Sequence, residues 1–238
     1  MTERIFITGA NRGIGLGIVR DYLENTEARI VATCRAPHDA HDLQALQAQA
    51  PQRLHILPLE VTDDRALAKL QQAVSQHLLG IDLLINNAGI NGTAGDGTRP
   101  LAELQRAALL NMINVNAVSA VLVVQALLPL LKAGTRPRIV MISSQMGSLD
   151  YLKNSSNYGY AMSKAAMNMG ARVLASELKA HGIISITTHP GWVQTDMGGT
   201  QAPLTVAESA RGLRAVFDRL TMDDNGAFYN WDGSTHAW

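Results

Sequence analysis

The sequence of 238 residues has little of several features that would assign it to a special class of protein. Its one cysteine, Cys34, cannot form a disulfide within the chain, so a reducing compartment such as the cytoplasm is expected. Its 20 basic residues balance 20 acidic ones, so no long-range field favours nucleic acid or an anionic membrane. Small molecules recognised by local contacts are therefore the expected ligands.

Three further absences concern a leader, a membrane span and a metal site. An apolar strand pattern begins at Arg4, which leaves no room for a signal peptide. The uncharged stretch 107–131 is interrupted by polar residues and by Pro129, which favours a buried helix over a membrane span. The seven histidines show no metal-ligand spacing, so no metal site is predicted.

Short β-branched runs alternate with longer amphipathic stretches along the chain, a pattern typical of βαβ units. Strands are predicted at 4–8, 29–34, 54–61, 81–86, 138–143, 183–189 and 227–229. Helices are predicted at 39–50, 63–79, 101–132 and 205–220, the third with a kink or stop at Pro129. No linker interrupts the pattern, so we expect one α/β domain over residues 1–238, a doubly wound seven-stranded parallel sheet with helices on both faces.

Three glycines follow the first predicted strand directly. Glycine permits positive φ and a close approach of the backbone to a diphosphate, and the N–H groups at a helix start favour its charge. Such glycines also occur in turns for steric reasons alone, but their place after the first strand favours a dinucleotide site. Its predicted contacts are Gly9, Asn11, Arg12, Gly13, Ile14 and Gly15.

The end of the second strand bears on the choice of cofactor. About twenty positions beyond the glycines, an acidic residue indicates NAD and an arginine indicates NADP. Arg35 lies at this end, and Arg12 could complete a clamp because the planar guanidinium matches phosphate oxygens. Both could instead be solvated surface arginines, but the missing acid favours NADP(H).

The candidate chemistry lies at the end of the fifth strand and on the helix after it. Tyr160 and Lys164 are four residues apart and share a helix face. A lysine cation beside a phenol lowers its pKa, which would let the tyrosine exchange a proton near neutral pH. Ser144 could donate a hydrogen bond to a substrate oxygen. The spacing alone also fits an ordinary helix with a half-buried tyrosine and an exposed lysine.

Two other segments leave the carboxyl ends of strands. Residues 86–89, Asn-Asn-Ala-Gly, leave room for a ligand, although a tight turn explains them equally well. Residues 189–195 contain a Pro-Gly turn, where the backbone and Thr195 could meet a cofactor. A buried asparagine is also expected in the long helix, and the residues themselves do not choose among Asn111, Asn114 and Asn116.

Together, the motifs Thr-Gly-x-x-x-Gly-x-Gly, Asn-Asn-Ala-Gly, Ser, Tyr-x-x-x-Lys and Pro-Gly resemble the short-chain dehydrogenase/reductase family over essentially the whole chain. Segments 142–148, 163–168, 189–199 and 231–233 further resemble its C-factor and sniffer carbonyl-reductase branch. The resemblance implies a single-domain Rossmann fold and NADPH-dependent reduction of a ketone or aldehyde to an alcohol.

The resemblance also implies roles for individual residues. Tyr160 would be the general acid/base, Lys164 would bind the nicotinamide ribose, Ser144 would orient the carbonyl, and Asn116 would support a proton-relay water. Further cofactor contacts are implied at Asn87, Ala88, Gly89, Pro190, Gly191, Val193 and Thr195. Met146 and Trp192 are expected in an apolar substrate pocket, although either could be core.

Two positions depart from the family pattern. Glu60, beside Val61, replaces the aspartate often found at the adenine site, and Ser119 replaces a glycine in the long helix. The alternative to a reductase is a non-catalytic NADP(H)-binding signalling or regulatory protein of the C-factor type, which needs the glycine loop but not the Tyr-Lys pair. The apolar surface of the long helices suggests a homodimer or homotetramer, although monomeric relatives exist.

Overall fold

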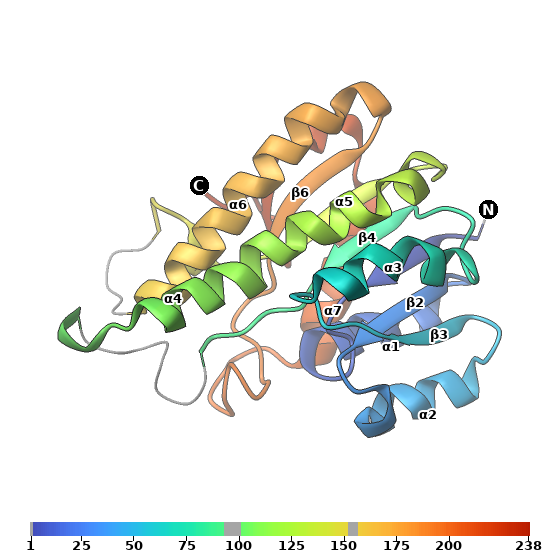
Figure 1. The fold of residues 1–238 in the computed structure, drawn as a ribbon, viewed down its shortest axis with the longest axis horizontal. Coiled ribbons are helices and arrows are strands. Elements are labelled where there is room, and N and C mark those ends of the chain that lie inside the picture. The colour runs from blue at the N-terminus through green and yellow to red at the C-terminus, as the bar shows by residue number, and fades with distance from the viewer. Residues whose placement is uncertain (1, 93–100, 152–156) are drawn as a thin grey trace.

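Seven parallel strands form one sheet in the order β3-β2-β1-β4-β5-β6-β7 (Figure 1). The computed structural model describes residues 2–92, 101–151 and 157–238. The strands are β1 Arg4–Ile7, β2 Arg29–Cys34, β3 Leu54–Pro58, β4 Leu83–Asn86, β5 Arg138–Ile142, β6 Ile184–His189 and β7 Phe228–Asn230. The order runs outward in both directions from β1 and β4, and ligands of such sheets bind where it reverses. The predicted doubly wound seven-stranded sheet is confirmed.

The helices cover both faces of the sheet, as the alternation along β1 requires. Ile5 and Ile7 pack on one side and Phe6 on the other, because successive strand residues point to opposite faces. One face carries α1 Gly13–Asn25, α2 His41–Gln49 and α7 Val206–Arg219, and the other carries α3 Asp64–Ser75, α5 Ser119–Lys132 and α6 Tyr158–Leu178. Figure 1 shows α3, α5 and α6 in front of the strands.

The predicted helix over 101–132 is divided into four parts. A 3₁₀ turn Leu101–Glu103 precedes α4 Arg106–Ile113, a π-helical segment spans Asn114–Val118, and α5 completes the stretch. Pro129 lies in the last turn of α5, which ends three residues later at Lys132. The sequence did not predict the π-helical segment, a kind of irregularity that often lies at a functional site.

The continuous helical stretch Arg106–Lys132 is long and apolar enough, by length and composition alone, to cross a membrane. The core helix of a globular domain passes the same test. The inner side of α5 supports this second interpretation, because Val123, Leu127 and Leu131 are buried against the sheet.

Charged residues close the amino edge of the sheet. Arg4 forms hydrogen bonds of 2.8 Å with both carboxylate oxygens of Asp82, and the fully buried Arg138 donates to Phe217 O at 2.7 Å and pairs with Glu3. These contacts satisfy the charges at this edge. The predicted functional segments lie at the opposite, carboxyl edge.

Candidate active site

The glycine loop after β1 is joined to the segment after β4. Asn87 Nδ2 donates to the carbonyl oxygens of Thr8 and Gly9 at 3.0 and 2.8 Å. Gly9 has a φ of +65°, and a Cβ there would lie 2.8 Å from Ala88 Cα. The Asn-Asn-Ala-Gly segment therefore holds the glycine loop in place, which goes beyond the tight turn that the sequence allowed.

The loop presents the start of α1 as an anion-binding site. Arg12 is the N-cap residue, its side chain makes no capping hydrogen bond, and the first turn of α1 contains no acidic residue. The backbone N–H groups there point toward the carboxyl edge of the sheet, and the helix dipole favours a negative group beside them. These features fit the diphosphate of a dinucleotide.

The two arginines predicted to bind a 2′-phosphate lie at this edge, both exposed. Arg35 follows β2, while Arg12 Nη1 lies 2.6 Å from a carboxylate oxygen of Asp196 in the loop after β6. That loop also reaches the glycine loop through Thr195, whose Cγ2 would lie 3.3 Å from a Cβ on Gly13. Sequence reasoning did not single out Asp196, because ion pairing across the site leaves no local pattern.

Glu60 and Val61 lie where the chain leaves β3. The half-buried carboxylate of Glu60 accepts hydrogen bonds from Thr62 N at 3.2 Å and Thr62 Oγ1 at 2.9 Å. The strand itself ends at Pro58, three residues earlier than predicted, because its partner β2 ends at Cys34, opposite Pro58. Val61 is buried and lines a crevice too narrow for a water molecule.

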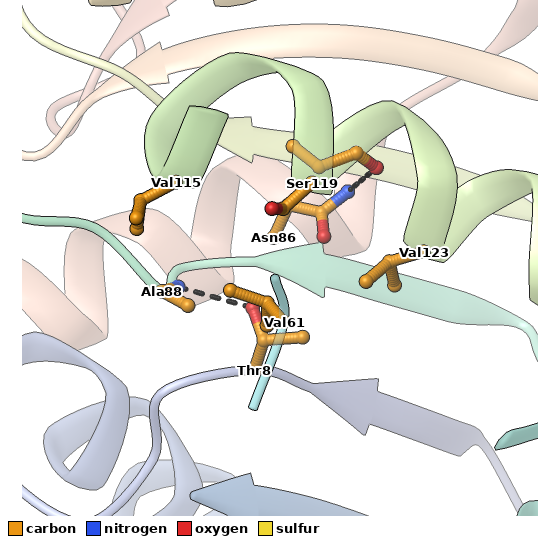
Figure 2. A pocket seen from close by; sticks show the side chains of 8 residues that line it. Thr8, Val61, Asn86, Ala88, Val115, Ser119 and Val123 are labelled. Atoms are coloured by element: carbon orange, nitrogen blue, oxygen red, sulfur yellow. Dashed lines mark hydrogen bonds between the residues drawn. The ribbon is translucent and has the colours of Figure 1, made fainter. Parts of the chain in front are cut away.

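That crevice lies under the start of α5 (Figure 2). It is lined by Thr8, Val61, Asn86, Ala88, Val115, Ser119, Ala120 and Val123. The two dashed bonds in Figure 2 run from Ala88 N to Thr8 Oγ1 at 3.0 Å and from Asn86 Nδ2 to Ala120 O at 3.0 Å. The first bond joins the segments that follow β4 and β1, and the second joins the end of β4 to α5. Ser119, where the family has glycine, donates to Asn114 O at 2.9 Å.

The three predicted catalytic side chains, Ser144, Tyr160 and Lys164, lie together at the carboxyl end of β5. Lys164 Nζ donates to Ile142 O at 2.8 Å and lies 5.6 Å from the centre of the Tyr160 ring. All three side chains are buried. The ordinary helix with an exposed lysine is therefore excluded.

Burial sets the proton affinities of this pair. It raises the pKa of Tyr160 to about 12, and only the hydrogen bond with Ser144 acts in the other direction. It also lowers the pKa of Lys164 to about 8, because the ammonium is the charged form. In this structure burial therefore outweighs the lowering of the tyrosine pKa that was expected from the lysine cation. A phenol with a raised pKa keeps its proton at neutral pH, as a proton donor needs to.

Among the three candidate asparagines, the structure buries Asn116 and leaves Asn111 and Asn114 exposed. Asn116 Nδ2 donates to Ile90 O and Ser163 Oγ, and its Oδ1 accepts from Ile90 N, each at 2.8 Å. A Cβ on Gly89 would lie 3.2 Å from Asn116 Oδ1 and 3.6 Å from Lys164 Nζ. The missing side chain at Gly89 thus keeps open the space between these two groups.

Asn168 was not assigned a role from the sequence, but it braces the site. Its Oδ1 accepts from Ser143 Oγ at 2.6 Å, and its Nδ2 donates to Gly147 O at 3.0 Å. Its spacing was a usable signal, since it lies one helical turn beyond Lys164 on the same face of α6. Asn157, also unassigned, caps α6 by accepting from Tyr160 N at 3.2 Å.

The loop after β6 closes on itself. Val193 is buried and pairs with Leu204, while Thr195 Oγ1 donates to Val193 O and accepts from Gly198 N. Trp192 is 53% exposed, and its Nε1 donates to Gly198 O at 2.7 Å, so it belongs to the loop surface and not to the core.

The turn at the base of this loop is fixed from two sides. Pro190 O accepts from Ser209 Oγ at 2.7 Å. Gly191 has a φ of +84°, and a Cβ there would clash with Leu204. Met146, the other predicted pocket residue, is half-buried in the turn after Ser144. In the described ranges, no three His, Cys, Asp or Glu side chains are grouped as metal ligands would be.

A family model described as short chain dehydrogenase matches residues 3–203. The C-signal protein of Myxococcus xanthus is 37% identical over 158 residues, which cover 66% of this chain and 93% of that protein.

Solved structures that match the whole chain include two carbonyl reductases. Carbonyl reductase Sniffer of D. melanogaster superposes with a TM-score of 0.93 at 32% identity, covering 100% of both chains. The NADPH-bound carbonyl reductase from chicken fatty liver gives 0.92 at 38% identity, covering 100% of this chain and 99% of that one.

Proposed function

The chain belongs to the short-chain dehydrogenase family, and from this premise we propose that it is an NADPH-dependent reductase that converts a ketone or aldehyde to an alcohol. Membership makes it an oxidoreductase. The observation that carries this proposal is the burial of Ser144, Tyr160 and Lys164 in one group at the same carboxyl edge of the sheet as the glycine loop. The likeness to two carbonyl reductases, one of them bound to NADPH, supports it.

The residues of the chain would hold the cofactor in three places. The N–H groups at the start of α1 would bind the diphosphate, and Arg12 with Arg35 would bind the 2′-phosphate. Pro190, Gly191, Val193 and Thr195 would face the nicotinamide, with Lys164 at its ribose. When bound, NADPH supplies the hydride that reduces the carbonyl carbon.

The proton in this reaction would come from Tyr160. Ser144 and Tyr160 would both donate to the carbonyl oxygen, so that negative charge developing there is stabilised as it forms. Because the pKa of Tyr160 is raised to about 12, the phenol is protonated at neutral pH and acts as general acid. Asn116 and Lys164 flank the space beside Gly89, where a water could return the proton to the phenol.

Steady-state turnover tests the proposal most simply. Purified protein should oxidise NADPH when supplied with members of a panel of aliphatic, aromatic and polycyclic ketones and aldehydes, and Tyr160→Phe should not. NADPH binding, followed by quenching of the tryptophan fluorescence of the protein, should be equal in both proteins. Turnover by the phenylalanine variant at the wild-type rate would contradict the mechanism.

The similarity to C-signal supports a second candidate, a non-catalytic NADP(H)-binding signalling or regulatory protein. Such a protein would need the glycine loop and not the buried Ser144, Tyr160 and Lys164. Tight NADPH binding without turnover of any carbonyl in the panel would favour this candidate over the reductase.

We also propose a cytoplasmic protein that forms a homodimer or homotetramer. Met162, Met169 and Val173 form an exposed apolar row on α6, and Leu110 of α4 and Val118 are also exposed. A second copy could cover this surface, because monomers rarely expose a large contiguous apolar patch. Light scattering after gel filtration should give two or four times the chain mass of 25.6 kDa.

A further inference from the structure

Two distant segments of the chain meet beside α6. One is Ser234–Trp238, which we name the strap, and the other is Gln145–Tyr151, the serine loop that follows Ser144. Leu149 N donates to Trp238 O, and the rings of Tyr151 and His236 meet edge to face at 5.7 Å. Figure 1 shows the chain end marked C beside α6.

The first half of the strap is bound to β7. Asn230 N donates to Ser234 O at 2.8 Å, and His236 N donates to Phe228 O at 2.7 Å. The ring of His236 is buried and stacks on Phe228 with 4.5 Å between the ring centres. These contacts make this part of the strap an added edge of the sheet.

The second half of the strap is bound to α6. The centres of the Trp238 and Phe228 rings lie 5.2 Å apart. The guanidinium carbon of Arg172, on α6, lies 5.1 Å from the centre of the Trp238 ring. An arginine over an indole is favourable because the ring face carries negative charge. The strap is therefore anchored independently of the serine loop.

The serine loop is fixed differently at its two ends. Next to Ser144, Asn168 binds Gly147, whose Cα packs closely on the backbone of Lys164. At the outer end, Leu149 and Tyr151 are 86% and 51% exposed, so burial of these two residues does little to hold the loop in place. The strap supplies the hydrogen bond and the ring contact that tie this outer end to the sheet.

The strap also touches the other side of the site. The ring centres of His236 and His189 lie 5.8 Å apart. His189 is the last residue of β6, and the Pro190–Thr195 loop begins directly after it. The same buried ring therefore contacts both the serine loop and the base of the loop after β6. Met146 and Trp192, the residues predicted to line the substrate pocket, lie on these two loops.

We propose that the strap positions the serine loop and thereby sets which carbonyl compounds are reduced, with His236 and Trp238 as positioning residues. This inference rests on the proposed reductase function. A small carbonyl compound needs only Ser144 and Tyr160, which are held by contacts that do not involve the strap. A carbonyl compound with a bulky apolar substituent also needs a serine loop that stays in place, because Met146 lies on that loop.

The test uses the full chain with His236→Ala and Trp238→Ala, which loosen different contacts of the strap. His236→Phe and Trp238→Phe are the conservative variants, and Ala237→Ser is the control at an exposed strap position. For each variant, hydrogen exchange of segments 145–151 and 9–15 is compared, together with kcat and KM for a small aliphatic and a bulky aromatic ketone. Melting temperature and NADPH binding identify general unfolding.

Both alanine variants should raise exchange in 145–151 and leave 9–15 unchanged. KM for the bulky ketone should rise about tenfold, the effect of about 1.4 kcal/mol of lost binding, while kcat for the small ketone changes less than about twofold. The phenylalanine variants should keep the wild-type ratio of the two KM values, because the strap needs an aromatic ring that packs and not a group that takes up a proton.

Unchanged exchange in 145–151 would overturn the proposal, as would an equal loss for both ketones together with weaker NADPH binding, which would mean a purely structural role. Exchange does not depend on turnover. It therefore decides whether the strap holds the loop even if the wild-type protein reduces no carbonyl compound, which would be a failure of the proposed function alone.

Discussion

Lys164 Nζ lies 5.6 Å from the centre of the Tyr160 ring and donates its hydrogen bond to the last carbonyl of β5. The ammonium is thus held by the sheet and not by the phenol. The hydrogen bond to β5 therefore holds the Lys164 ammonium in a fixed position beside the Tyr160 ring. It also leaves each pKa to be set mainly by burial.

The opposite pKa shifts predict an alkaline limb in the pH profile of reduction. The pKa of Lys164 is lowered to about 8, so its ammonium is lost as the pH rises through that value, while Tyr160, with a pKa of about 12, keeps its proton. Because kcat/KM reports groups of the free enzyme, kcat/KM for NADPH should fall above about pH 8, with the slope expected for the loss of one proton. A flat profile up to the titration of Tyr160 would contradict the assignment.

The neighbouring serines after β5 should separate chemistry from stability. Ser144→Ala should lower kcat by about 10²- to 10³-fold, as expected when a donor to a developing oxyanion is removed. Ser143→Ala removes the partner of buried Asn168 Oδ1 and should cost about 1–3 kcal/mol of unfolding free energy. Turnover measurements and urea unfolding of both variants check this division, which fails if the two serines behave alike.

Cofactor preference should depend on Arg35. Arg35→Ala should weaken NADPH binding by about 10- to 100-fold, because one charge-assisted contact to the 2′-phosphate contributes about 1.5–3 kcal/mol. NADH binding should be unchanged. Arg29→Ala is the matched control, since Arg29 is an exposed arginine at the opposite end of β2. Equal effects on NADPH and NADH would mean that Arg35 does not recognise the phosphate.

Gly89 offers a test of the space between Asn116 and Lys164. In Gly89→Ala, the added methyl group would lie 3.2 Å from Asn116 Oδ1 and 3.6 Å from Lys164 Nζ, close but tolerable. We expect kcat to fall about tenfold, a change of about 1.4 kcal/mol in the barrier, with little change in melting temperature. Gly170→Ala is the control. Its methyl group would make a similarly tight contact, 3.1 Å from Val121 Cγ2, but Gly170 lies on α6 and its methyl group would not enter the space between Asn116 and Lys164. Wild-type kcat in Gly89→Ala would remove any role for this space.

The sequence predicted the sheet well because strand and helix periodicities are local signals. All seven strands were expected, and glycines at positive φ, such as Gly9, marked the turn where backbones approach closely. The boundaries were less accurate where a neighbouring strand decides them, as at Pro58, where β3 ends opposite the last residue of β2.

The site was only partly predictable, because its contacts join residues that are distant in the chain. Spacing brought Tyr160 and Lys164 together, but it could not show that burial would raise the tyrosine pKa. Nothing local identified the π-helical segment that carries Asn116, or the pairing of Arg12 with Asp196.

Single-turnover oxidation of bound NADPH in Tyr160→Phe tests whether Tyr160 donates the proton in an NADPH-dependent carbonyl reduction. We expect NADPH binding equal to wild type and a rate lower by about 10²- to 10⁴-fold, the contribution typical of a general acid. NADPH oxidation at the wild-type rate in this variant would contradict this role of Tyr160.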